Sequence, residues 1–189
     1  ALELVLEDIA TSLEDSFLDG APIVCFSAMD PTGAERVTEA LVRLLDEKDR
    51  QQRGAPRRVD RPFKMSVDRV FSVRGFGTVV TGTSTTGIVT VGDSVSVLPG
   101  EGRARIRGIQ VHGEAVDSAA PGMRIALNLQ GLNHDEVSRG GVITHGEALD
   151  VVSMFDGTFK VPERVHDPLP NRSRVLVHLG TAQVEGTLS

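Results

Sequence analysis

The spacing of apolar residues divides the chain into three regions, of which the first covers residues 1–49. Apolar side chains recur at helical spacing over Leu2–Phe17 and again over Gly33–Leu45, so two helices are expected, the first ending at Asp19-Gly20. Between them, the short β-branched segment 21–28 predicts a buried strand. Helix, strand and helix in this order are typical of a parallel α/β sheet. A buried parallel strand needs neighbours on both sides, and nothing else in the chain supplies them.

The second region follows a polar stretch, residues 47–62, which has no apolar periodicity and predicts a linker. From Phe63 to about Gly146 the apolar period changes to two, and glycines recur at short intervals. Several short strands with such turns predict a small antiparallel barrel or sandwich. The third region contains two more strand-like segments, 155–161 and 174–179, which are too few to close a barrel.

The predicted fold is therefore mainly β, with an antiparallel β-barrel or sandwich between an α/β piece and the beginning of another β domain. The expected boundaries are 1–48 for the α/β piece, 49–61 for the linker, 62–148 for the barrel or sandwich and 149–189 for the incomplete domain.

The first barrel strand contains one irregular position, Arg69. Its sequence parity is that of the apolar residues Phe63, Met65, Val67, Phe71 and Val73. An arginine on an apolar face is costly unless its head group reaches water or a partner. The alternative is a β-bulge near Asp68–Val70 that shifts the phase of the strand. Both interpretations mark Asp68-Arg69 as a break in an otherwise regular strand.

A later strand, residues 122–129, alternates more regularly. We expect one face to point into the core, with Arg124 and Asn128 together on the opposite face; the core residues are Met123, Ile125, Leu127 and Leu129. By itself, Arg124 is most simply an exposed arginine of a strand.

Charge is unevenly distributed in a chain whose formal net charge is −6. Residues 1–49 carry twelve acidic against three basic residues, whereas residues 50–75 carry eight basic against two acidic ones. The basic stretch is either a surface for an anion such as nucleic acid or a solvated, arginine-rich linker. Cys25 is the single cysteine, and no apolar run approaches the length of a membrane span, so a cytoplasmic protein without membrane contact is expected.

Common enzyme motifs are missing from the sequence. It has no GxxxxGK[ST] phosphate loop, and Gly75-Phe76-Gly77 lies between two strands, where it predicts a hairpin turn. The five histidines show no paired spacing typical of metal ligands. We therefore expect no catalytic residue and no metal site, and no enzymatic activity of this chain by itself.

Two segments resemble a known family. Residues 67–99, including GFGTVVTGT, are similar to the first strands of domain two of elongation factor Tu relatives, and residues 122–144, with GMRIALN, to its later strands. Residues 61–83 and 122–128 are most similar to the selenocysteine-specific, SelB-type factors of that family. Ile23–Met29 resembles the last guanine-contacting motif of their GTPase domain, so that residues 1–48 would be the C-terminal part of a P-loop GTPase domain. The resemblance further implies that residues 62–148 form the antiparallel β-barrel of domain two and that residues 149–189 begin a second β-barrel, domain three.

The resemblance implies roles for particular residues. Domain two of these factors holds the aminoacyl group of charged tRNA, and matching by motif puts Asp68, Arg69 and Arg124 in that pocket. The 3′ end of the tRNA would lie near Gln110 and His112. In the full-length protein, Ser27, Ala28 and Met29 would contact the nucleotide base. Two arginines suit a selenocysteine cargo, because a selenol ionises below neutral pH and a serine hydroxyl does not.

The resemblance also implies partners of the whole protein. These are selenocysteinyl-tRNA, the ribosome, GTP with Mg²⁺, and an mRNA element bound through a C-terminal region that this sequence does not contain. The phosphate loop and switch regions are missing as well, so GTP hydrolysis belongs to the full-length protein and this chain needs no cofactor of its own. Two alternatives remain: another translational GTPase, such as a general elongation factor or an initiation-factor gamma-type subunit, and a stand-alone β-barrel interaction protein.

Overall fold

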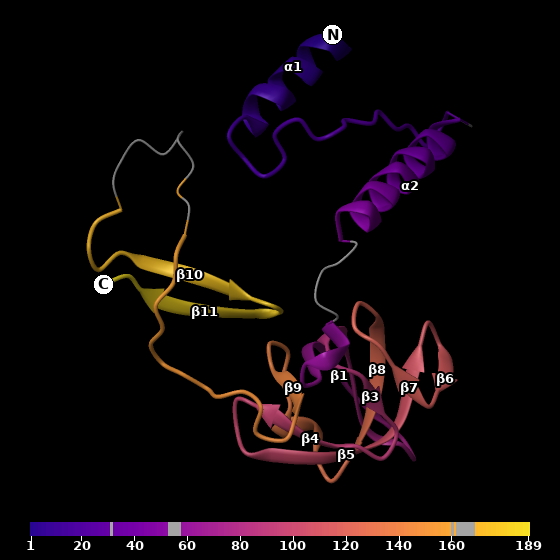
Figure 1. Cartoon of the computed structure of the whole chain (residues 1–189), viewed down its shortest axis with the longest axis vertical. Coiled ribbons are helices and arrows are strands. Elements are labelled where there is room, and N and C mark those ends of the chain that lie inside the picture. Colours follow the sequence, from indigo (N-terminus) through magenta and orange to yellow (C-terminus); the bar gives the residue numbers. More distant parts are fainter. Residues whose placement is uncertain (31, 53–57, 160, 162–168) are drawn as a thin grey trace. The chain divides into compact units, whose positions relative to one another are not determined.

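The structure is a computed structural model that describes residues 1–30, 32–52, 58–159, 161 and 169–189. Its elements (Figure 1) are grouped into two compact units, residues 1–56 with 157–168 and residues 57–156 with 169–189. The first unit contains α1 (Leu2–Leu13) and α2 (Gly33–Gln52). The second contains η1 (Arg58–Asp60), β1 (Lys64–Val73), β2 (Gly77–Thr86), β3 (Val89–Thr90), β4 (Ser94–Leu98), β5 (Gly102–Val111), β6 (Glu114–Val116), β7 (Ser118–Ala119), β8 (Arg124–Gln130), η2 (His134–Glu136), β9 (Val142–His145), β10 (Arg174–Leu179) and β11 (Ala182–Thr187).

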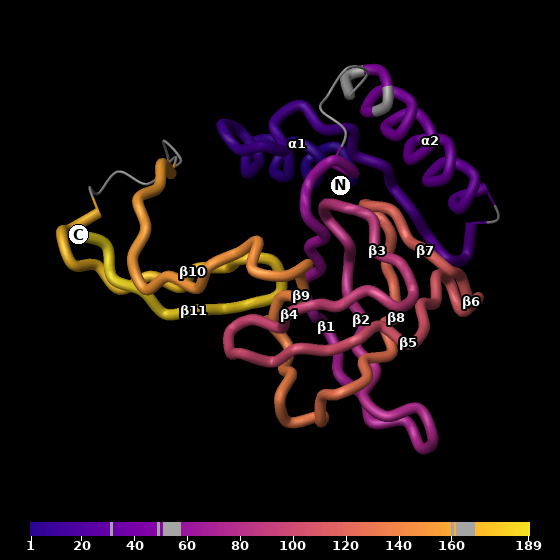
Figure 2. Tube along the Cα trace, turned by 60° about the horizontal axis from the view of Figure 1, so that its bottom comes forward, coloured from indigo at the N-terminus to yellow at the C-terminus, as the bar shows by residue number. Residues whose placement is uncertain are grey.

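Six strands of the second unit form a closed antiparallel barrel, which confirms the predicted fold class. The strand order is β4-β9-β1-β2-β8-β5, and β5 pairs with β4 to complete the ring. The GFG segment is the predicted hairpin turn: Val73 pairs with Gly77, and the Phe76 N–H donates to the Val73 carbonyl. The β1–β2 hairpin extends beyond the other strands in Figure 2.

The barrel core consists mainly of aliphatic side chains from the inward positions of the six barrel strands, together with Phe63 and Met65. In β8 the predicted alternation holds for Ile125, Leu127 and Leu129, all 2% exposed or less. Met123 was predicted to share this face, but it is 40% exposed. It precedes the first residue of β8, where the pleat no longer fixes its direction.

A β-bulge in β1 resolves the irregular parity of that strand. Val67 pairs with Gly82 and Arg69 pairs with Thr81, so Asp68 is an additional residue without a partner of its own. Beyond the bulge Val70 packs against the core, while Phe71 is 41% exposed. The second of the two interpretations of Arg69 is therefore correct, because the bulge shifts the phase of the strand by one residue.

Among its described residues, the first unit contains the two expected helices but no strand. The segment 21–28 forms no strand, contrary to the prediction, because a buried strand requires pairing partners and none of the described residues provides them. For the same reason the apolar residues of the helices stay at the surface: α1 buries no side chain, and Leu41 and Leu45 of α2 are 55% and 64% exposed.

Both helix ends differ from the predicted positions. The first helix ends at Leu13, before Asp19-Gly20, because the Ser16 hydroxyl and N–H both donate to the Leu13 carbonyl and close a turn there. The second continues to Gln52, into residues assigned above to a linker. Residues 53–57 of that linker lie outside the described part of the chain, and the domain boundaries at 48, 61 and 148 stay predictions.

The third region contributes a β-hairpin, β10–β11, in which Arg174 pairs with Thr187 and Leu179 with Ala182. The strand expected at 174–179 is thus confirmed. The strand expected at 155–161 is wrong for residues 155–159 and 161, which are not paired with any strand, while residue 160 lies outside the described residues. Among the described residues, no helix is long and apolar enough to span a membrane.

Leu127 tests the barrel core. Its side chain is fully buried, and we expect Leu127→Ala to lower the free energy of unfolding by about 2–5 kcal/mol through lost burial and the cavity left behind. Urea denaturation followed by far-ultraviolet circular dichroism measures this change. Leu179→Ala, at a position 70% exposed in the hairpin, is the control and should change it by less than about 0.5 kcal/mol.

Gly82 tests the close packing of β1 against β2. A Cβ at Gly82 would lie 2.1 Å from the Ser66 carbonyl oxygen, a backbone atom that moves only with its strand. Gly82→Ala should therefore destabilise the barrel by about 1–3 kcal/mol or more in the same measurement. Gly108→Ala is the matched control, because no atom lies within 4 Å of its added Cβ. Equal stability of the two variants would contradict the predicted packing.

Candidate functional site

The outer face of β1, β2, β8 and β5 brings the predicted site residues into register. Arg69 of β1 pairs with Thr81 of β2, Thr81 pairs with Ala126 of β8, and Ala126 pairs with Gln110 of β5. Directly opposed residues of antiparallel strands point to the same face of a sheet, so these four side chains form one row across the barrel surface. The four strands run side by side in this order in Figure 2.

The bulge adds a second side chain to this row. Because two residues of β1 stand opposite one residue of β2, Asp68 and Arg69 both face Thr81. Without the additional residue, regular alternation would point neighbouring side chains to opposite faces. The bulge therefore places an acid and a base together on the outer face of the barrel, beside the row that leads to Gln110.

Asp68 and Arg124 form a two-pronged ion pair on this face. Arg124 Nη1 donates to Asp68 Oδ2 at 2.6 Å, and Arg124 Nη2 donates to Asp68 Oδ1 at 3.1 Å. The hydroxyl of Thr81 donates to Asp68 Oδ1 at 2.6 Å and accepts from Arg124 Nη2 at 3.3 Å. Such fork-like pairs fix geometry as well as charge, so the Arg124 guanidinium is held in one orientation.

Solvent exposure differs between the members of this cluster. The side chain of Asp68 is 22% exposed, whereas that of Arg124 is 51% exposed and can still be reached from outside. Arg69 is exposed and has no ion pair or hydrogen bond with any residue that the structure describes. Counting Asp68, Arg69 and Arg124, the cluster carries one uncompensated positive charge, which suits a ligand with one negative charge.

Thr81 is the member of the site that the sequence interpretation missed. It is an ordinary threonine of a strand in the printed sequence, and threonine is common in strands. Its outward parity relative to the buried Val80 was a usable signal, but its link to Asp68 depends on the bulge register.

Gln110 and His112 lie at the β5 side of the same face. Gln110 is exposed and belongs to the row described above. His112 is exposed in the turn between β5 and β6, with φ of 53°, directly after Val111, which pairs with Ile125 beside Arg124. Neither side chain contacts Asp68 or Arg124, so the structure places them near the cluster along the strands without joining them to it.

A second bulge occurs in β5. Ile106 pairs with Leu129 and Gly108 with Asn128, which leaves Arg107 as the additional residue. Arg107 is exposed and has no polar partner among the described residues. Its neighbours on β5 differ, since Arg103 pairs with Glu147 at 3.0 Å and Arg105 donates to the Gly92 carbonyl at 3.1 Å. Arg107 is therefore the β5 arginine that is available to an anion.

Ser27, Ala28 and Met29 belong to the first unit, in an exposed turn before α2. The Met29 N–H donates to Ser27 Oγ at 3.3 Å, and the Met29 side chain is 91% exposed. The turn leads to Asp30, whose carboxylate accepts hydrogen bonds from the Thr32 hydroxyl and N–H and pairs with Arg36. These contacts hold the pKa of Asp30 below its usual range, and the hydrogen bond from the Thr32 hydroxyl has the largest effect.

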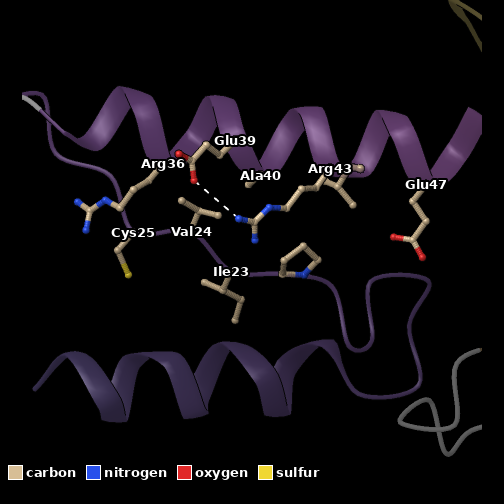
Figure 3. A pocket seen from close by; sticks show the side chains of 10 residues that line it. Ile23, Val24, Cys25, Arg36, Glu39, Ala40, Arg43 and Glu47 are labelled. Carbon is tan, nitrogen blue, oxygen red and sulfur yellow. Dashed lines mark ion pairs between the residues drawn. The ribbon is translucent and has the colours of Figure 1, made fainter.

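The same unit has a shallow groove of about 430 Å³ between α2 and residues 22–25 (Figure 3). Arg43 and Glu39 of α2 form an ion pair there with a nitrogen-to-oxygen distance of 3.8 Å. The groove contains none of the predicted aminoacyl-site residues. Within the described parts of the chain, no three His, Cys, Asp or Glu side chains gather as they would around a metal ion.

The barrel and the whole chain are similar to known translation factors. Residues 77–144 match the family described as elongation factor Tu domain 2. Over 183 residues the chain is 38% identical to the selenocysteine-specific elongation factor of Desulfomicrobium baculatum. This alignment covers 97% of this chain and 28% of that protein. The chain thus spans about a quarter of the length of the curated relative it matches.

Solved structures agree with this similarity. The chain matches a bacterial selenocysteine-specific elongation factor, EF-Sec, with a TM-score of 0.65 and 32% identity over 76% of this chain and 23% of that one. It matches apo SelB of Methanococcus maripaludis with a TM-score of 0.78 and 25% identity over 98% of this chain and 41% of that one. The chain therefore belongs to the elongation factor Tu family of translation elongation factors, and within that family it is similar to the selenocysteine-specific members.

Proposed function

We propose that the outer face of β1, β2 and β8 holds the aminoacyl end of selenocysteinyl-tRNA, as part of a selenocysteine-specific elongation factor. The observation that carries this proposal is the cluster of Asp68, Arg69 and Arg124, which lies on the barrel whose residues 77–144 match elongation factor Tu domain 2. The similarity over nearly the whole chain to selenocysteine-specific factors supports the choice of cargo.

Charge gives the cluster a means to select its cargo. Asp68 compensates one arginine and leaves a single positive charge, which the selenolate of ionised selenocysteine would neutralise. A seryl group has a smaller, neutral hydroxyl in place of the selenolate, and it would leave that charge without a counter-ion as the bound tRNA end excludes water. Sites with polar groups that a wrong ligand leaves unpaired reject that ligand strongly.

Asp68 has two conceivable roles, which are to orient an arginine or to bind the aminoacyl amine. The geometry supports orientation, since both carboxylate oxygens of Asp68 already accept hydrogen bonds from Arg124 and Thr81. Arg124 keeps an exposed edge toward a ligand, and Arg69 stands beside it across from Thr81. In this arrangement the two arginines contact the anion and Asp68 sets their separation.

The proposal extends, in less detail, to the activities of the full-length factor. GTP and Mg²⁺, when bound, would supply the change between tRNA-holding and tRNA-releasing states, and the ribosome and an mRNA element would receive the complex. Ser27, Ala28 and Met29 fit a contact with a nucleotide base, because the turn is exposed and the Ala28 N–H has no acceptor among the described residues. We assign no hydrolytic step to any residue of this chain.

The alternative is another translational GTPase, because the family match at residues 77–144 is to a domain named for elongation factor Tu. The two functions differ in cargo. A general factor would hold many aminoacyl groups with similar affinity and would gain nothing from an uncompensated arginine in the pocket.

Arg124 tests the pocket. In the full-length protein, Arg124→Ala should lower the preference for selenocysteinyl-tRNA over seryl-tRNA by about ten- to a hundred-fold, the range expected for lost charged hydrogen bonds. Arg124→Lys keeps the charge without the fork and should retain part of the preference. Each affinity is measured as the protein concentration at which hydrolysis of the aminoacyl ester of the tRNA is half suppressed.

Two results of this experiment would contradict the proposal. One is equal protection of both tRNAs by the unaltered protein, which would favour a general factor. The other is an unchanged ratio in Arg124→Ala with both affinities reduced alike, which would make Arg124 a general tRNA contact. Circular dichroism of each variant shows whether the barrel has kept its fold.

Arg107 provides the matched comparison. It lies on the outer face of the barrel and has no polar partner in the part of the chain that the structure describes, and we propose that it contacts a phosphate of the tRNA backbone. Arg107→Ala should weaken binding of both tRNAs alike and lower the slope of log affinity against log salt by about one. A change in the ratio of the two affinities would instead place Arg107 in the aminoacyl pocket.

A further inference from the structure

The tip of the β10–β11 hairpin contacts the barrel beside the bulge. The Thr181 hydroxyl, in the turn between β10 and β11, donates a hydrogen bond to the backbone carbonyl of Val67 at 2.6 Å. Val67 is the residue directly before Asp68 in β1. The contact joins two positions 114 residues apart in the sequence.

Val67 lies where the pairing of β1 with β9 ends. The last paired residues are Ser66 and Val142, and beyond them the Gly140 N–H donates to the Val67 carbonyl at 3.0 Å. The Val67 N–H in turn donates to the Gly141 carbonyl at 2.8 Å. A carbonyl oxygen has two lone pairs, so Thr181 occupies the acceptor position that Gly140 leaves open.

The hairpin tip fits closely against this part of the barrel. Gly180 has φ of 62°, and a Cβ at this position would lie 2.5 Å from Ser66 Oγ. On the neighbouring segment, a Cβ at Gly140 would lie 3.2 Å from the Ala182 Cα. A side chain at Gly180 would require Ser66 to move, and one at Gly140 would be crowded by Ala182, so the Thr181 hydrogen bond is part of a packed contact.

We propose that Thr181 is a positioning residue that fixes the bulge and, through the bulge, the Asp68–Arg124 pair. The expected effect of Thr181 on cargo selection rests on the proposed function. A bulge residue lacks a pairing partner of its own, so its position depends on the residues on either side of it. Val67 is held by Thr181 on one side of Asp68. Thr81 holds the carboxylate itself, at 2.6 Å. The hairpin thus completes the support of a site that lies on the barrel.

The effect should appear in cargo selection more than in affinity for tRNA as such. A selenolate contacts the arginines directly, and its binding depends on where Asp68 holds Arg124. A seryl group does not use that charge. Loosening the bulge should therefore weaken selenocysteinyl-tRNA binding without weakening seryl-tRNA binding.

Two measurements on Thr181→Val, which keeps the shape and loses the hydroxyl, test this proposal. In the ¹⁵N-labelled chain of 189 residues, the side-chain Nε–H resonance of Arg124 should shift or broaden. In the full-length protein, the preference for selenocysteinyl-tRNA over seryl-tRNA should fall about three- to ten-fold, the effect of one net hydrogen bond. Thr181→Ser restores the donor and should restore both signals.

Thr187→Val is the matched control, since Thr187 is an exposed threonine of the same hairpin, paired with Arg174, with no side-chain hydrogen bond to the barrel among the described residues. An unchanged Arg124 resonance in Thr181→Val would overturn the proposal, and so would an equal loss of affinity for both tRNAs, which is the mark of a merely structural contact. A shifted resonance in a protein that does not discriminate the two tRNAs would overturn the cargo function and leave the coupling of Thr181 to Arg124 intact.

Discussion

One additional residue in β1 determines what the outer face of this barrel can do. Up to Val67 the strand alternates between core and surface, and after Asp68 it alternates again with the opposite phase. The strand thereby buries Val67 and Val70 on one side and presents two adjacent charged residues on the other. A regular strand of the same sequence would have turned either Arg69 or Asp68 into an aliphatic core, at a large cost in free energy. The charged site and the intact core are therefore two results of the same irregularity.

Much of the barrel could be predicted from the sequence because its signals are local. Period-two alternation placed Ile125, Leu127 and Leu129 in the core, and Gly75-Phe76-Gly77 at a hairpin turn. The parity of Arg69 marked the place of the bulge without deciding between a bulge and a buried arginine. That decision depends on the register between β1 and β2, which is a long-range property of the folded chain.

Other predictions failed where local signals need a partner. Residues 21–28 have the composition of a buried strand, but backbone pairing takes two strands, and none of the described residues pairs with this segment. Met123 had the parity of the core residues, but it lies one residue before β8, whose pleat would have directed its side chain into the core. The roles of Thr81 and Thr181 could not be predicted, because a threonine hydroxyl acquires a role only through the group that it contacts, here Asp68 and the Val67 carbonyl; the outward parity of Thr81 indicated its face but not this contact.

The ring of six strands has a consequence for how such a domain can be reused. Each of its strands is paired on both sides over part of its length, so none of the six is an edge strand along its whole length, although β1 beyond Val67 pairs with β2 alone. New contacts are then made mainly by side chains on the outside of the ring or by loops between strands. A barrel of this kind can be combined with different neighbouring domains without competition for its backbone, and its specificity can change through a few outward residues while the core stays the same.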